Sequence, residues 1–170
     1  MLTINKLITQ ARGLAPVLIR RASTVELDWD TRQKSRFDTT DSAGRRLGVF
    51  LPRGSVVRGG DVLVTEDGSL VRVVAAAQPV LRVSACAEHG TPLDLMRAAY
   101  HLGNRHVQLE IHGDHLQLEP DPVLADMLLA MHLTVNKNQA PFEPEAGAYA
   151  AEGHAHAGAH DHDHDHGHHH

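Results

Sequence analysis

Short stretches in which hydrophobic and polar residues alternate dominate the first half of the chain. Between residues 25 and 83 they include VELDWD, DVLVTED and LVRVVAA, and turn-forming sequences such as DSAG, RGG and EDGS separate them. A period of two is typical of strands, and Gly, Asp and Ser tolerate the backbone conformations of tight turns. The pattern predicts a small β-rich domain, a sandwich or a barrel, over residues 1–80.

The hydrophobic pattern changes near residue 80, where helical periods appear between strand-like segments. In TPLDLMRAAYHLG, Thr91 is suited to cap a helix, Pro92 to begin it, and Gly103 to end it in a left-handed conformation. DPVLADMLLAMH repeats this order, with Asp121 as the cap and Pro122 as the first helical residue. The first helix carries one apolar stripe, formed by Leu95, Met96, Ala99, Tyr100 and Leu102.

The two predicted helices lie between four predicted strands, PVLRVSAC, HVQLEI, HLQLE and LTVNK. The resulting order, β-α-β-β-α-β, is that of the ferredoxin-like fold, which we predict over residues 81–150. Residues 151–170 contain no large apolar side chain and cannot offset their ordering entropy by burial, so we predict a disordered tail there. The expected fold class is α+β, with two domains and a tail.

The first 25 residues have two interpretations. They contain Lys6, Arg12, Arg20 and Arg21 and no acidic residue before Glu26, as in a transit peptide. The alternative is a β-rich beginning of the folded domain. The sequence leaves open whether residues 1–24 belong to the fold.

Charge and cysteine content narrow the function. The net charge is −5, and the segment from residue 151 supplies four acidic and no basic residues, so residues 1–150 carry 16 basic and 17 acidic side chains. This balance argues against nucleic-acid binding, which needs a concentrated basic face. The single cysteine, Cys86, cannot form an intrachain disulfide, and no apolar stretch approaches the roughly 20 residues of a membrane span. We therefore expect a cytoplasmic protein without nucleic-acid or membrane partners.

Nine of the fifteen histidines lie in the last seventeen residues, HAHAGAHDHDHDHGHHH. Imidazole nitrogen suits Ni²⁺, and Cu²⁺, Zn²⁺ and Co²⁺ are expected to bind the same ligands. Loose, repeated ligands favour capture and transfer of ions over catalysis, which needs a fixed geometry with an open position. A purification tag is the alternative, but the Asp, Ala and Gly interruptions favour a natural metal-binding tail. The predicted tail ligands are His154, His156, His160, His162, His164, His166, His168, His169 and His170.

Six histidines precede the tail, and single histidines are more often surface residues than ligands. His132 is predicted in the last turn of a helix, where a partial positive charge is favoured. His106 follows GNR at an exposed junction from helix to strand, and two copies related by a two-fold axis could share one ion. His112 and His115 straddle a predicted turn and could chelate an ion; the alternative is that both are merely solvated. The remaining two are His89 and His101.

Several motifs together resemble the urease accessory protein E family. They are YHLGNRHVQLEI, DPVLADML and PFEPEAGAYA running into a His-rich tail, with KSR at 34–36 and LPRGSVVRGGDVL at 51–63. The resemblance implies a cytosolic nickel metallochaperone with a β-rich N-terminal domain and a ferredoxin-like metal-binding domain through which it forms a homodimer. It also implies that His106 binds nickel at the dimer interface. An internal H-x-H pair of some family members is replaced here by Pro120 and Pro122, so that site is absent or rebuilt, with His112 and His115 as one possibility.

The resulting hypothesis is a nickel-binding metallochaperone that captures Ni²⁺ and delivers it to apo-urease during assembly of the urease nickel site. The resemblance implies the urease accessory GTPase and the urease maturation complex as partners. A metal storage or buffering protein with no dedicated client is the alternative, and a metal-dependent enzyme is a third reading. We expect no enzymatic activity, because the sequence has neither a G-x-x-x-x-G-K-[ST] phosphate loop nor an H-E-x-x-H zinc motif.

Overall fold

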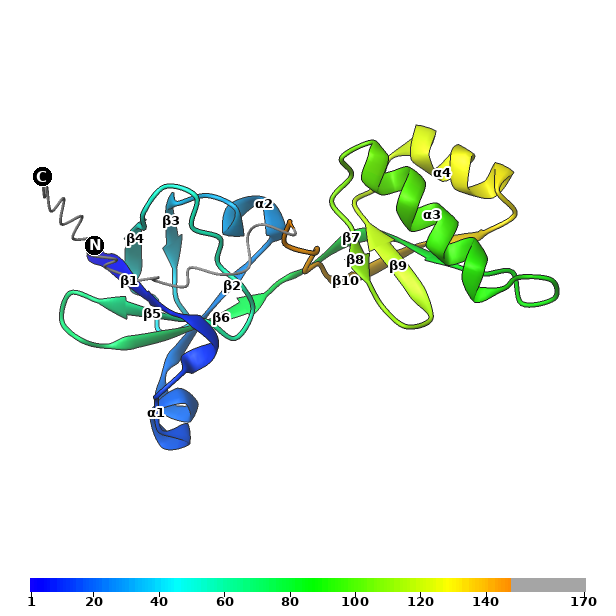
Figure 1. Ribbon diagram of the computed structural model, residues 1–170. Helices are drawn as coiled ribbons and strands as arrows, with labels where there is room; N and C mark the ends of the chain where they lie inside the picture. Colours follow the sequence, from blue (N-terminus) through cyan, green and yellow to red (C-terminus); the bar gives the residue numbers. More distant parts are fainter. Residues whose placement is uncertain (148–170) are drawn as a thin grey trace, which may run out of the picture.

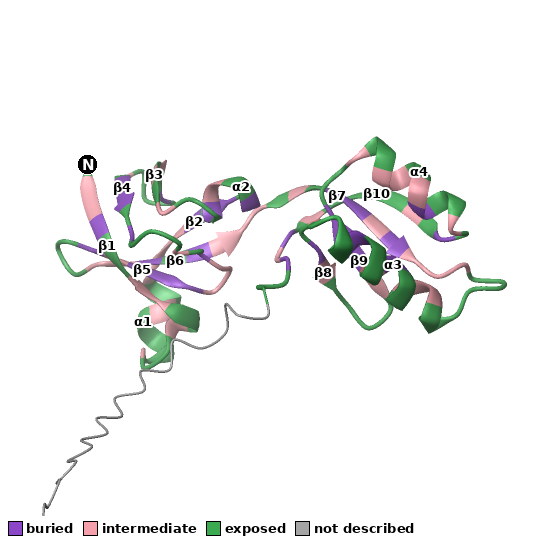
Figure 2. Ribbon diagram, turned by 45° about the horizontal axis from the view of Figure 1, so that its top comes forward, coloured by how far each residue is buried: buried purple, intermediate pink, exposed green. Residues whose placement is uncertain are grey.

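The computed structural model describes residues 1–147, whose strands form one sheet of six strands and one of four. The two sheets belong to two separate lobes (Figure 1). Buried residues concentrate in the strands of both sheets, and the helices turn largely exposed faces outward (Figure 2). No helix in this part of the chain has the length and apolar character needed to cross a bilayer. The predicted tail, residues 151–170, lies outside the described residues.

The N-terminal sheet has the strand order β2-β6-β5-β1-β4-β3. Its hydrophobic core is built mainly from Val and Leu of alternating strand positions, as the period of two predicts. Two short helices and one 3-10 turn connect its strands. The elements are β1 (Leu2–Ile8), η1 (Thr9–Ala11), α1 (Pro16–Arg21), β2 (Ser23–Leu27), α2 (Trp29–Arg32), β3 (Arg36–Thr40), β4 (Arg46–Phe50), β5 (Val62–Thr65) and β6 (Leu70–Ala75).

Strand β1 lies in the middle of this sheet. It pairs in parallel with β4 and antiparallel with β5, and the side chain of Ile4 is fully buried. Removing it would open the sheet between two strands and expose the core, so the structure contradicts the transit-peptide interpretation of this segment.

The alternation in VELDWD predicts a single strand, but the segment does not form one. Strand β2 ends at Leu27, and α2 begins at Trp29. The carboxylate of Asp28 accepts a hydrogen bond from the backbone N–H of Thr31 at 2.9 Å, which caps the helix. The capping bond therefore favours a helix over the strand that the alternating pattern predicts, and the side chain of Trp29 is buried.

The C-terminal domain has the predicted order of elements, and its sheet is antiparallel throughout, in the order β10-β7-β9-β8. Leu81 and Val83 of β7 share one hydrophobic core with Leu102 and Leu128, so α3 and α4 cover the same face of the sheet (Figure 1). The elements are β7 (Ala77–Ser84), α3 (Pro92–Asn104), β8 (Glu110–Ile111), β9 (His115–Leu118), α4 (Pro122–Ala130) and β10 (Thr134–Pro141).

The predicted helix beginnings are confirmed. The carboxylate of Asp94 accepts hydrogen bonds from the backbone N–H of Thr91 at 2.8 Å and from its hydroxyl at 2.9 Å, and these bonds lower the pKa of Asp94. Asp121 caps α4 by accepting a bond from the N–H of Leu124 at 2.9 Å. The stripe predicted on α3 is only partly buried, because Met96 and Tyr100 are exposed.

Candidate metal-binding site

His106 is the residue just beyond the C-cap of α3, and its backbone is left-handed (φ 57°). Its N–H donates to the carbonyl of Gly103 at 2.9 Å, and the N–H of Val107 donates to the carbonyl of Leu102 at 3.1 Å. This pair of bonds defines a Schellman motif, whose left-handed position is usually glycine. The prediction that Gly103 ends the helix is therefore wrong, since α3 continues to Asn104.

The position of the helix end follows from core packing. Val107 packs against the hydrophobic cluster that contains Leu102, and a Schellman motif favours such an apolar contact. The chain therefore reverses at His106, although Gly103 would adopt the left-handed conformation more easily. A non-glycine residue in this conformation is uncommon and directs attention to a function for its side chain.

The side chain of His106 is available to a ligand. His106 is exposed, and no described residue hydrogen-bonds its imidazole. No group of three or more His, Cys, Asp or Glu side chains converges on a possible ion within residues 1–147. Any ion at His106 therefore needs ligands from beyond these residues, from a second chain or from solvent. The predicted tail ligands lie outside the described residues.

His132 ends α4 in the same way as His106 ends α3. Its backbone is left-handed (φ 60°), its N–H donates to the carbonyl of Leu129 at 3.0 Å, and the N–H of Leu133 donates to the carbonyl of Leu128 at 3.2 Å. His132 thus lies beyond the last helical residue, Ala130, and not in the last turn as predicted. His101 is exposed in the last turn of α3, next to Tyr100.

Cys86 lies near His132, a histidine that is distant from it in the sequence. With His89, Asp94 and His132 it lines a cavity of about 400 Å³. Backbone N–H groups of Glu88 and then His89 lower the pKa of the Cys86 thiol. Sequence reasoning missed this grouping because Cys86 and His132 come together only when β7 and α4 pack in one domain.

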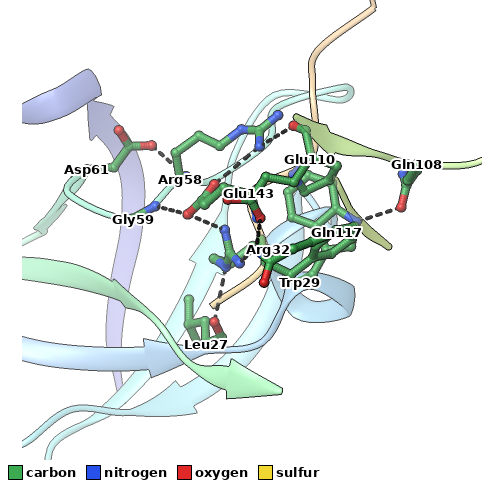
Figure 3. A network of polar contacts seen from close by, with 12 residues as sticks. Leu27, Trp29, Arg32, Arg58, Gly59, Asp61, Gln108, Glu110, Gln117 and Glu143 are labelled. Atoms are coloured by element: carbon green, nitrogen blue, oxygen red, sulfur yellow. Dashed lines mark hydrogen bonds and ion pairs between the residues drawn. The ribbon is translucent and has the colours of Figure 1, made fainter. Parts of the chain in front are cut away.

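Figure 3 shows how the segment just before the tail is anchored to the N-terminal domain. Glu143 forms ion pairs with Arg32 at 2.7 Å and Arg58 at 3.2 Å. The ring of Trp29 lies under the Arg58 guanidinium, and its indole N–H donates to Gln108 of the C-terminal domain at 2.6 Å. These contacts join the two domains beside the point where the described chain ends.

The RGG sequence of the N-terminal domain, residues 58–60, binds the carboxylate of Glu143. The backbone N–H of Gly59 donates to the Glu143 carboxylate at 2.8 Å, and a Cβ atom at Gly59 would lie 2.9 Å from the same oxygen. Only glycine leaves room for this approach. The motif PFEPEAGAYA thus begins as an interdomain anchor, since Phe142 is fully buried beside Trp29.

Two family models divide the chain between them. The UreE urease accessory protein C-terminal domain model matches residues 78–170, and the N-terminal domain model matches residues 4–76. The chain belongs to the UreE urease accessory protein family. The two UreE matches meet between β6, which belongs to the six-stranded sheet, and β7, which belongs to the four-stranded sheet. The boundary predicted at residue 80 lies within β7.

UreE proteins of several bacteria are similar to most of the chain. The urease accessory protein UreE of Paracidovorax citrulli (strain AAC00-1) is 74% identical over 154 residues, which cover 91% of this chain and 73% of the relative. That of Albidiferax ferrireducens is 74% identical over 154 residues, 91% of this chain and 88% of the relative. That of Ralstonia nicotianae is 54% identical over 154 residues, which cover 91% of this chain and 71% of the relative. These UreE relatives are named as accessory proteins of urease and not as enzymes.

Proposed function

We propose that the chain is a nickel-binding metallochaperone that captures Ni²⁺ and delivers it to apo-urease during assembly of the nickel active site. The observation that carries the proposal is His106, exposed and held in a left-handed conformation at the end of α3, in a chain whose two domains match the UreE family models. Ni²⁺ is the cargo of this protein, and imidazole is a suitable ligand for it.

The proposal includes a homodimer formed through a ferredoxin-like C-terminal domain, with one ion between paired His106 side chains. Exposed apolar side chains recur at Leu93, Met96 and Tyr100 on α3, the helix that ends at His106. Three residues with this spacing lie on one side of a helix, and an exposed apolar patch is typical of a surface that contacts a partner. The nine histidines of the tail collect ions, and the urease accessory GTPase and maturation complex receive them in the cytoplasm.

Delivery is tested with nickel-loaded protein, the other urease maturation proteins, apo-urease and a chelator that outcompetes urease for free nickel. A delivery protein is expected to restore urease activity under these conditions, because it passes the ion without releasing it. The same amount of nickel salt should not. A storage protein without a client would activate urease no better than the salt, and that result would contradict the proposal.

The tail is expected to hold most of the bound nickel. At about three imidazoles per ion, nine histidines hold roughly three ions per chain. Stopping the chain after residue 150 should therefore remove the roughly three tail ions per chain and keep the one ion per dimer at the paired His106 side chains, because that site needs only the interface. Equilibrium dialysis of both chains measures the difference. A truncated dimer that binds no nickel would show that the interface site depends on the tail.

A further inference from the structure

The hairpin between β8 and β9 brings two histidines into direct contact. The backbone N–H of His112 donates to the carbonyl of His115 at 2.9 Å and closes the turn through Gly113 and Asp114. The two imidazole rings stack, with centroids 4.2 Å apart and planes inclined by 7°. The hairpin is separate from His106, and the sequence left open whether its two histidines chelate an ion or are merely solvated.

Each of the two imidazoles is oriented by a carboxylate. Nε2 of His112 lies 2.8 Å from Glu110, and Nδ1 of His115 lies 2.6 Å from Asp114. A carboxylate accepts hydrogen bonds, so in a neutral imidazole the engaged nitrogen carries the hydrogen and the other nitrogen keeps its lone pair. The nitrogens left to bind an ion are therefore Nδ1 of His112 and Nε2 of His115. Pairing a histidine with a carboxylate in this way is typical of metal ligands.

The orienting carboxylates are themselves held. Glu110 also accepts bonds from the side chain of Gln117 at 3.2 Å and from the backbone N–H of Glu143 at 2.8 Å. Asp114 pairs with Arg82 at 3.3 Å. The side chain of His115 is only 12% exposed, whereas that of His112 is 39% exposed and open to solvent. One imidazole is thus fixed by the fold, and the other can adjust to an arriving ion.

We propose that His112 and His115 form a further metal site, which chelates a divalent cation such as Ni²⁺ through two imidazole nitrogens. Two imidazoles on one ion, with N–metal distances of about 2.0–2.1 Å and a near-right angle, have ring centroids about 4.5 Å apart. The observed 4.2 Å is close to this, and the rings must rotate out of their parallel stack so that the free nitrogen of each points at the ion. Water completes the coordination on the exposed side of His112, while Glu110 and Asp114 offset the charge of the ion.

This site goes beyond the proposed function, because it requires binding of an ion and not its delivery. It is tested on the full-length chain with His112→Gln and His115→Gln. The matched control is His101→Gln, which removes one exposed imidazole that lies next to Tyr100 on α3. Nickel bound at saturation is measured by equilibrium dialysis, and paramagnetic broadening of the amide resonances of Gly113 and Leu116 is followed by NMR.

We expect His112→Gln and His115→Gln each to bind one ion fewer per chain than His101→Gln, with loss of the broadening at the hairpin. Asp114→Asn should weaken the binding of this ion about tenfold, and Asp126→Asn on the exposed surface of α4 should leave its binding unchanged. Equal nickel content in all three histidine variants, with hairpin resonances that nickel leaves sharp, would overturn the proposal and reduce the pair to a packing contact. Failure of nickel delivery to urease with this binding intact would overturn only the proposed function.

Discussion

Replacing His106 with alanine is expected to reduce urease activation at limiting nickel by at least about tenfold. Loss of a group that merely orients a metal ligand weakens binding by about 10–100-fold, and loss of the ligand itself should weaken it at least as much. The measurement is urease activity after reconstitution with the variant and with the unchanged chain, the tail being kept in both. Unchanged activation would remove His106 from the proposed mechanism.

Replacing His106 with glycine distinguishes the effect of losing the imidazole from the effect of backbone strain. Because His106 has φ 57°, the side chain imposes strain that His106→Gly relieves, and the free energy of unfolding should rise by about 1 kcal/mol. His106→Ala keeps the strain. Both variants lack the imidazole, so equally low activation by the two would assign the defect to metal binding and not to folding. Recovery of activation in the glycine variant alone would contradict the assignment.

Replacing Arg32 with alanine should lower the free energy of unfolding by about 3 kcal/mol, at the lower end of the range for breaking a buried ion pair. The Arg32 side chain is fully buried, and it donates to the carbonyl of Leu27 at 3.0 Å, to that of Phe142 at 2.6 Å and to the Glu143 carboxylate at 2.7 Å (Figure 3). Its loss leaves the two carbonyls without this buried donor. Urea denaturation measures the change.

The control for Arg32 is the exposed ion pair between Lys34 and Asp30, also 2.7 Å long. Lys34→Ala should change the free energy of unfolding by less than about 1 kcal/mol, because solvent screens such pairs. Arg32→Lys keeps the charge but not the planar fork that reaches three acceptors, and it should remain clearly destabilised. Equal small effects of Arg32→Ala and Lys34→Ala would show that the interdomain network contributes little.

Most of the C-terminal domain could be predicted because its signals are local. The helix beginnings at Thr91 and Asp121 depend on residues within one turn, and both are found where the sequence indicates them. The helix end of α3 could not be predicted in this way. It depends on Val107 reaching the core with Leu102, a contact that local propensity at Gly103 does not describe.

The candidate site was predictable to a similar extent. His106 was identified from its place after GNR and from the family resemblance, and the structure adds its left-handed backbone and its exposure. The closeness of His112 and His115 was expected from the turn between them. Their stacking, and the different nitrogen that each directs at a carboxylate, depend on side-chain torsions that no sequence pattern specifies.

The sequence alone determined the order of the elements in the C-terminal domain, the junction that carries His106 and the resemblance to a family, because periodicity, caps and motifs are properties of neighbouring residues. Tertiary structure alone decided that β1 is a central strand and that Arg32 binds Glu143, residues 111 positions apart. Burial of a charge or of a strand is settled by which distant segments cover it. Those contacts are set by packing between whole elements and not by any one of them.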